Sequence, residues 1–397
     1  MIQKTETLMV SGDSKRRAGV GAICAGVCLA GALLLAGCGK FFPPLSSGGG
    51  GGNGGGGGSS SGDYLYVGNQ STNPLTVAGF SLASSALNVI SGSPFQVSLE
   101  PTSLAITPDN TYLYMGSAAG GIYVFTIGSN GALSLANGGA PVATGVEPSV
   151  LRVDSTGRWL LGADAFAGEA YVFQIGSGGV LTSISSSIVQ LNTATPAQDL
   201  EIAPSNSLVY VSLGTGGVYT LSFDASNGAL QQINGVLQPK QSGGADYGMA
   251  VTPSGNFLLV AETGIGGVRV LSASSSGGLS EISGSPFKTA TGAYWVVVDS
   301  TGTYAYVANR ANGNISAFSI GTTGALTAIT GSPFATGTSP VQMIEDKGHT
   351  YLAVVCAGGS PDMQVFSINS TTGVLTSFKT ATTGNDPTQA TVIAATH

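Results

Sequence analysis

The sequence contains few charged residues, and two of them stand where they could do chemistry together. Only 8% of the 397 residues are Asp, Glu, Lys or Arg, yet Glu262 and Arg310 occupy equivalent places in neighbouring copies of an internal repeat. A carboxylate held ionised beside a guanidinium can act as a general base toward water, and the guanidinium can stabilise a developing oxyanion. The two residues can also form a structural ion pair between repeats. This is the simpler interpretation, because such pairs form easily at a protein's rim.

Further polar and aromatic residues fall at the same edge of the repeats. They are Asp164, Asp246, Tyr247, Tyr294, Trp295 and Asn309. Carboxylates accept hydrogen bonds from hydroxyl groups, and aromatic faces stack on the rings of ligands. We therefore predict that these residues bind a small, sugar-like ring. For each single residue, a solvated channel rim is the alternative.

Other kinds of site lack the residues that they need. A Ser-His-Asp arrangement requires a histidine, and the only two are His349, in a predicted turn, and His397, the last residue. No cluster of His, Cys or carboxylates has the spacing of a metal site, so we expect no metal and no cofactor. From Cys38 onward there are 9 Lys and Arg against 18 Asp and Glu, with no basic cluster. This balance argues against a nucleic-acid partner.

The elements that must position these residues are short strands in a repeat. Residues 101–145 contain four runs of β-branched, aromatic and aliphatic residues, separated by turn-forming residues. The second run of each copy begins at Tyr64, Tyr112, Trp159, Leu208, Phe257, Tyr304 and Tyr351, at intervals of 47 to 49 residues. Such a sheet cannot bury both faces alone and must stack against its copies. The prediction is an all-β, seven-bladed β-propeller of four-stranded antiparallel blades.

The two ends of the repeat region predict how the ring closes. The first copy begins at its second strand, 63–67, whereas the chain finishes with a first-strand pattern over 387–394. We expect this C-terminal strand to complete blade 1 and remove the open sheet edge. First strands are innermost, so the starts of first strands and the ends of second strands should surround one mouth of the central channel. A ring closed in this way needs no partner, and we expect a monomer.

The region before the repeats has the pattern of an export signal. Lys15, Arg16 and Arg17 precede an uncharged stretch that ends in Leu35-Ala-Gly-Cys38. These four residues resemble the lipobox of bacterial lipoproteins, in which the cysteine is lipidated. We predict a signal peptide over 1–37, a lipidated Cys38 with a Gly/Ser-rich tether over 38–62, and the propeller over 63–397. The protein is then anchored in the cell envelope, on the periplasmic or outer-membrane side; an uncleaved membrane anchor is the alternative.

The amino-acid sequence of the repeats resembles the seven-bladed β-propeller lactonase family, which includes 6-phosphogluconolactonases and carboxymuconate cycloisomerases. The matching motifs are Pro101-Thr-Ser-Leu-Ala-Ile-Thr-Pro-Asp109, Val251-Thr-Pro-Ser-Gly-Asn-Phe257 and Tyr304-Ala-Tyr-Val-Ala-Asn-Arg310. The resemblance implies catalytic or anion-binding roles for Glu262 and Arg310. It also implies two histidines and a second arginine, but Ser149 and Asp246-Tyr247 stand in their places.

Two of the four places in that constellation, the blade 3 histidine and the blade 5 Arg-His pair, are therefore unfilled, and two hypotheses about function follow. The first is a lipid-anchored module that binds a small sugar or lactone, or an envelope protein, through an incomplete lactonase site. The alternative is an exported lactone hydrolase in which Glu262 activates water and Arg310 stabilises the oxyanion. Whether the protein is an enzyme is left open by the sequence.

Overall fold

The computed structural model describes residues 62–70, 75–165, 167–184, 186–191, 195–264, 267–383 and 390–397. These residues belong to one compact unit, Lys40–His397, of the two into which the chain divides. The predicted signal peptide, Cys38 and nearly all of the predicted tether lie outside the described residues. Among the described residues, no helix has the length and apolar character needed to cross a bilayer.

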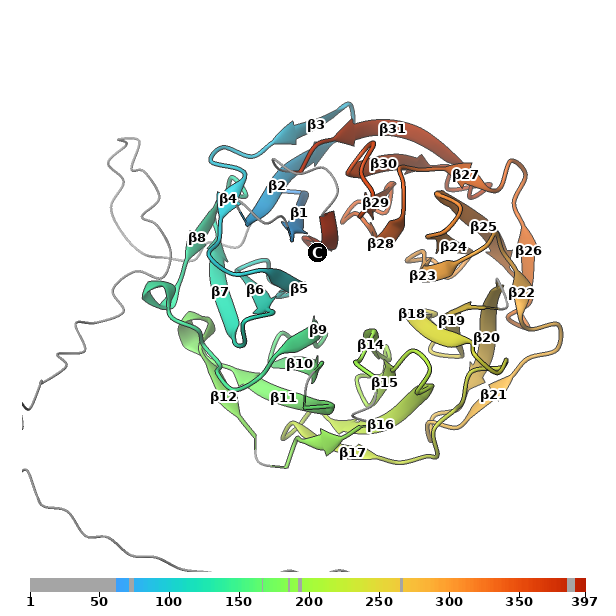
Figure 1. Cartoon of the computed structure of the whole chain (residues 1–397), viewed down its shortest axis with the longest axis horizontal. Coiled ribbons are helices and arrows are strands. Elements are labelled where there is room, and N and C mark those ends of the chain that lie inside the picture. Colours follow the sequence, from blue (N-terminus) through green and yellow to red (C-terminus); the bar gives the residue numbers. More distant parts are fainter. Residues whose placement is uncertain are drawn as a thin grey trace, which may run out of the picture. The chain divides into compact units, whose positions relative to one another are not determined.

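Seven antiparallel sheets stand in a ring around a central channel (Figure 1). The innermost strands are β32 (Ala390–Ala395), β5 (Pro101–Ile106), β9 (Pro148–Val153), β14 (Asp199–Ile202), β18 (Ala245–Val251), β23 (Ala293–Val298) and β28 (Pro340–Glu345). The second strands are β1 (Tyr64–Asn69), β6 (Tyr112–Ser117), β10 (Trp159–Asp164), β15 (Leu208–Ser212), β19 (Phe257–Thr263), β24 (Tyr304–Asn309) and β29 (Tyr351–Cys356). All seven second strands begin at the residue predicted from the repeat.

The outer half of each blade contains two further strands. The third strands are β2 (Thr76–Ala83), β7 (Ile122–Ile127), β11 (Glu169–Ile175), β16 (Val218–Asp224), β20 (Gly267–Ala273), β25 (Asn314–Ile320) and β30 (Met363–Ile368). The fourth strands are β3 (Ala86–Val89), β8 (Leu133–Leu135), β12 (Leu181–Ser183), β17 (Ala229–Gln232), β21 (Leu279–Glu281), β26 (Leu326–Ala328) and β31 (Leu375–Ala381). Short 3₁₀ turns occupy Asn137–Gly139 and Ser177–Gly179.

Four of the sheets carry a fifth, two-residue strand that the sequence did not predict. These strands are β4 (Phe95–Gln96), β13 (Val189–Gln190), β22 (Phe287–Lys288) and β27 (Phe334–Ala335), and each pairs with the third strand of its blade. Three of them contain the phenylalanine of the recurrent Gly-Ser-Pro-Phe motif. The motif thus returns the chain to the third strand before it enters the next blade.

The ring closes as predicted. Strand β32 pairs antiparallel with β1, with Leu65 opposite Ala395 and Val67 opposite Ile393. In addition, the Tyr64 amide donates to Thr396 Oγ1 at 2.9 Å. The two ends of the repeat region therefore complete one sheet, and no open edge remains between the first and last blades.

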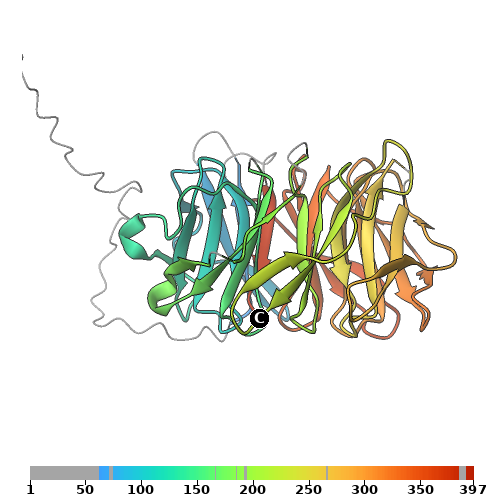
Figure 2. The same ribbon diagram turned by 90° about the horizontal axis from the view of Figure 1, so that it is seen from below.

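Apolar side chains from adjacent sheets form the core, and buried tyrosines join neighbouring blades. The Tyr66 hydroxyl donates to the Gly131 carbonyl oxygen at 2.7 Å, and the Tyr114 hydroxyl donates to that of Gly179 at 3.0 Å. Because each hydroxyl satisfies a carbonyl in the next blade, the repeat encodes contacts between blades as well as the strands within them. Figure 2 shows the resulting disc from its side.

Candidate functional site

A cavity of about 500 Å³ lies at the mouth of the channel that the sequence predicts as the site. Its walls include the starts of innermost strands from five successive blades, at Thr102, Ser149, Gln198, Tyr247 and Tyr294. We call it the tyrosine cavity. Four of the predicted site residues line it: Tyr247, Tyr294, Trp295 and Arg310.

Arg310 and two tyrosines form a stacked group in this cavity. The guanidinium carbon of Arg310 lies 4.8 Å from the centroid of the Tyr294 ring, and that ring lies 4.5 Å from the Tyr247 ring. Burial raises the pKa of Tyr294 above its ordinary value, which keeps the phenol neutral. The group therefore presents a cation and aromatic surface, with no carboxylate among its own members.

Backbone register decides which predicted residues reach the cavity. Successive side chains of a strand point to opposite faces. In five blades, the residue that lines the cavity is the one that follows the end of the second strand. These residues are Gln70, Ala118, Ala165, Arg310 and Ala357. The predicted strand-end residues, including Asp164, Glu262 and Asn309, are not among the lining residues, and on the first strand of blade 5 Tyr247 lines the cavity instead of Asp246. The predicted ring of site residues is thus displaced by one position.

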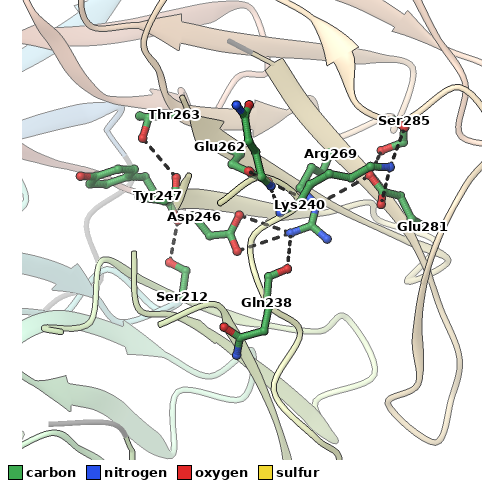
Figure 3. Close-up of polar contacts among 12 residues, drawn as sticks. Ser212, Gln238, Lys240, Asp246, Tyr247, Glu262, Thr263, Arg269, Glu281 and Ser285 are labelled. Carbon is green, nitrogen blue, oxygen red and sulfur yellow. Dashed lines mark hydrogen bonds and ion pairs between the residues drawn. The ribbon is translucent and has the colours of Figure 1, made fainter. Parts of the chain in front are cut away.

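Glu262 instead belongs to a buried ionic cluster inside blade 5 (Figure 3). Its side chain is fully buried, and its Oε2 lies 3.5 Å from Nε of Arg269. The backbone amides of Lys240 and Gln241 donate to its two oxygens at 3.1 and 3.2 Å. Among the described residues Arg310 has no ion-pair partner, so the predicted ion pair between Glu262 and Arg310 is wrong. Arg269, on the strand next to Glu262, is the partner.

Asp246 faces the same guanidinium from the other side. Both of its carboxylate oxygens lie 3.5 Å from Nη1 of Arg269, and the side chain is fully buried. Burial raises its pKa to about 7, with Arg269 opposing the shift and Glu262 adding to it. Glu281 connects the cluster to the surface: its Oε1 lies 3.7 Å from Nε of Arg269, and its Oε2 lies 2.9 Å from Nζ of Lys240. Asp246 therefore has a structural partner instead of a place in the tyrosine cavity.

The other two predicted ligand-binding residues are also engaged within their blades. Asp164 accepts hydrogen bonds from the backbone amides of Glu147 at 2.5 Å and Ala167 at 2.6 Å. The Asn309 amide lies 2.9 Å from Ser316 Oγ on the neighbouring strand. Both side chains are almost wholly buried. These contacts hold the turns of the rim in place, and the structure does not bring either residue to the tyrosine cavity.

Two arginines that the sequence analysis overlooked each contact more than one carboxylate. Arg269 lies in the third strand of blade 5, and Arg152 lies in an innermost strand with Asp199 2.7 Å away. In the sequence, Arg269 stands between two valines, and Arg152 stands between a leucine and a valine. Because the chain has so few charges, a charged residue inside an apolar strand is the sequence signal that could have identified both arginines. Among the described residues no group of His, Cys, Asp and Glu has the arrangement of a metal site.

The fold and this cavity define a seven-bladed β-propeller whose channel opens into a small aromatic site lined by Arg310, which pairs with no carboxylate of the described residues. Residues 64–392 match the family model described as lactonase, 7-bladed β-propeller. The chain belongs to that family. No curated protein matches the sequence.

Solved structures with the same fold are distant in sequence. A putative 6-phosphogluconolactonase from Bacteroides fragilis is 19% identical, with a TM-score of 0.70 over 85% of this chain and 99% of its own. A protein from Lactobacillus plantarum is 19% identical, with a TM-score of 0.69 over 85% of this chain and all of its own. The periplasmic gluconolactonase of Pseudomonas aeruginosa is 15% identical, with a TM-score of 0.66 over 84% of this chain and 99% of its own. At this identity the likeness concerns the fold.

Proposed function

We propose that this protein is a lipid-anchored binding protein of the cell envelope, and that its tyrosine cavity holds a small sugar acid or sugar lactone. The observation that carries the proposal is Arg310. Its guanidinium is stacked 4.8 Å from the Tyr294 ring in the wall of the cavity, and among the described residues no carboxylate pairs with it. A guanidinium placed in this way can donate two parallel hydrogen bonds to a carboxylate.

The rest of the tyrosine cavity supports a hydroxylated ligand. Tyr247 and Tyr294 offer aromatic faces to the C–H side of a sugar ring, and Gln198 and Ser149 line the same cavity with hydrogen-bonding groups. A volume of about 500 Å³ suits a ligand of this size. The names of the structural relatives, gluconolactonase and putative 6-phosphogluconolactonase, concern the same class of compound.

Binding is favoured over hydrolysis by the position of Glu262. A general base must reach the water that it activates. Glu262 is fully buried, with its oxygens held by two backbone amides and by Arg269. Of the residues that the structure describes, no histidine lines the tyrosine cavity, and the carboxylate that lines it is Glu147, which is exposed. The lactone-hydrolase alternative through Glu262 and Arg310 would require Glu262 to leave these partners.

Calorimetric titration of the purified full-length protein in detergent with gluconate tests the proposal. The variant Arg310→Met should bind gluconate about tenfold to a hundredfold more weakly, because a charge-assisted hydrogen-bond pair is lost. Arg158→Met is the matched control, since Arg158 stacks on Trp159 at the same 4.8 Å but lines neither described cavity. Equal affinity of wild type and Arg310→Met, or no binding by either, would overturn the proposal.

Hydrolysis of glucono-1,5-lactone, followed by proton release, separates the two functions. A binding protein should show the same background rate in the wild type and in Glu262→Gln. Turnover by the wild type that Glu262→Gln abolishes would establish the hydrolase instead.

The proposed anchor has its own test. Cells fed an alkyne-labelled fatty acid should label the wild-type chain and leave Cys38→Ser unlabelled. Equal labelling of both chains would contradict lipidation at Cys38.

A further inference from the structure

A second cavity, of about 540 Å³, opens at the opposite ends of the innermost strands. The last residues of four innermost strands, Ile106, Val153, Val251 and Val298, form its walls, together with Ile344, which precedes the last residue of a fifth. Arg152 and Trp295 line both this cavity and the tyrosine cavity, so they lie where the two halves of the channel meet. We call the second one the glutamate cavity, after Glu201 in its wall.

Glu201 is the under-coordinated member of an ionic triad at the inner end of this cavity. Arg152 Nη2 lies 2.7 Å from Asp199 Oδ1 but 3.4 Å from Glu201 Oε1. Asp199 is fully buried and also accepts hydrogen bonds from the backbone amides of Leu200 at 2.9 Å and Met249 at 2.8 Å. Glu201 has one long contact with a guanidinium already engaged, and its side chain is 25% exposed, toward the cavity that it lines.

The charges of the triad do not balance. Two carboxylates face one guanidinium, which leaves one excess negative charge when both carboxylates are ionised. Burial raises the pKa of Glu201 to about 8, with Arg152 opposing the shift and Asp199 adding to it, so near neutral pH Glu201 balances the triad by holding a proton that a cation would replace. A second cation beside Glu201 would remove this imbalance.

The outer part of the glutamate cavity has the same sign of charge. Glu345, Asp346, Lys347, His349 and His397 line its outer part, so two side-chain carboxylates face one ammonium group there. Glu345 accepts a hydrogen bond from the Ser300 amide at 2.9 Å and lies 3.1 Å from Nδ1 of His349. An anionic ligand would be repelled at the mouth and again at the triad, whereas a cation is attracted at both.

We propose that the glutamate cavity is a second binding site, for a small organic cation that carries an ammonium group on an apolar body. The ammonium donates hydrogen bonds to Glu201 and completes the charge balance with Arg152 and Asp199. The apolar body lies against the valine and isoleucine walls, and the indole of Trp295 offers an aromatic face to the cation. This site is separate from the one proposed for sugar acids, and either can exist without the other.

Calorimetric titration of the full-length protein in detergent with cyclohexylammonium chloride tests the proposal. Cyclohexanol and cyclohexanecarboxylate serve as neutral and anionic probes with the same ring. The wild type should bind the ammonium compound at least about tenfold more tightly than either. Equal binding of cyclohexanol, tighter binding of the carboxylate, or no binding of the ammonium compound would overturn the proposal.

Two variants locate the site. Glu201→Gln keeps the size of the side chain and removes its charge, and should weaken cyclohexylammonium binding about tenfold or more. Glu100→Gln is the matched control, because Glu100 is exposed and lines neither described cavity. Val251→Phe narrows the cavity without changing the triad, and should weaken binding even if Glu201→Gln fails to fold. Unchanged affinity in a folded Glu201→Gln or in Val251→Phe would contradict this location.

Discussion

Glu262 Oε2 lies 3.5 Å from Nε of Arg269, and both side chains are buried inside one blade. This relationship explains why a residue that the family resemblance marks as catalytic is engaged structurally here. Asp246 occupies the place where the family resemblance implies a basic residue, and it contacts the same guanidinium. Arg269 thus balances two carboxylates that would otherwise be buried without a cation.

Replacing Arg269 should destabilise the fold strongly. Arg269→Met leaves Asp246 and Glu262 buried without a cation, and should lower the free energy of unfolding by about 3–5 kcal/mol. Urea unfolding followed by circular dichroism measures the change. Lys240→Met is the control, because its ion pair with Glu281 is solvent-exposed and should contribute about 1 kcal/mol or less. A similar small loss in both variants would contradict a structural role for Arg269.

The hydroxyl groups that join the blades should contribute measurably to stability. Tyr114→Phe leaves the Gly179 carbonyl without its buried donor, and should cost about 1–2 kcal/mol in urea unfolding. Tyr112→Phe is the comparison, since its hydroxyl makes no hydrogen bond with the described residues, and should stay within about 0.5 kcal/mol of the wild type. Equal stability of the two variants would show that the contact between blades is not stabilising.

Gly248 provides the space that the Trp295 ring occupies. A Cβ atom at Gly248 would lie 2.8 Å from both Cα and Cε3 of Trp295. Gly248→Ala should therefore shift Trp295 and cost about 1–3 kcal/mol, with a changed near-ultraviolet circular dichroism spectrum. Gly235→Ala meets no atom within 4 Å and should leave both properties unchanged. An unaltered spectrum and unchanged stability in Gly248→Ala would contradict this close approach of Trp295.

Asp63 should make stability fall as the pH rises. Burial, and then its contact with Asp346, raise its pKa to about 7 in the folded chain, against about 3.9 in the unfolded chain. The folded state therefore keeps a proton that the unfolded state loses, so the stabilisation is complete below about pH 4 and is lost as the pH rises through about 7.

The comparison with Asp63→Asn isolates this effect from Asp246 and Glu201, whose pKa values are raised in the same direction. Between pH 5 and 8, the free energy of unfolding should fall by about 1–2 kcal/mol more in the wild type than in Asp63→Asn, after allowance for solvent screening at this half-buried site. Parallel pH profiles of the two proteins in urea unfolding would contradict the raised pKa.

The sequence by itself determined the architecture. Seven copies of one spacing, the start of every second strand from Tyr64 to Tyr351, and the closure by the last strand were all predictable, because hydrophobic periodicity and turn residues are local properties. The same analysis placed Tyr247, Tyr294, Trp295 and Arg310 at one mouth of the channel. This was possible because strand order determines which strands are innermost and which of their ends lie at the same mouth.

Only the tertiary structure decided which side of each strand faces the channel and which charges meet. Irregular pairing, such as the register shift between Asp246 and Met249, sets which of two adjacent residues points inward, and a one-residue change reverses the face. The partners of Arg269 and Arg152 lie on other strands or in other blades, so no spacing in the sequence indicates them. Chemistry at the channel therefore depends on contacts that the repeat pattern leaves undetermined.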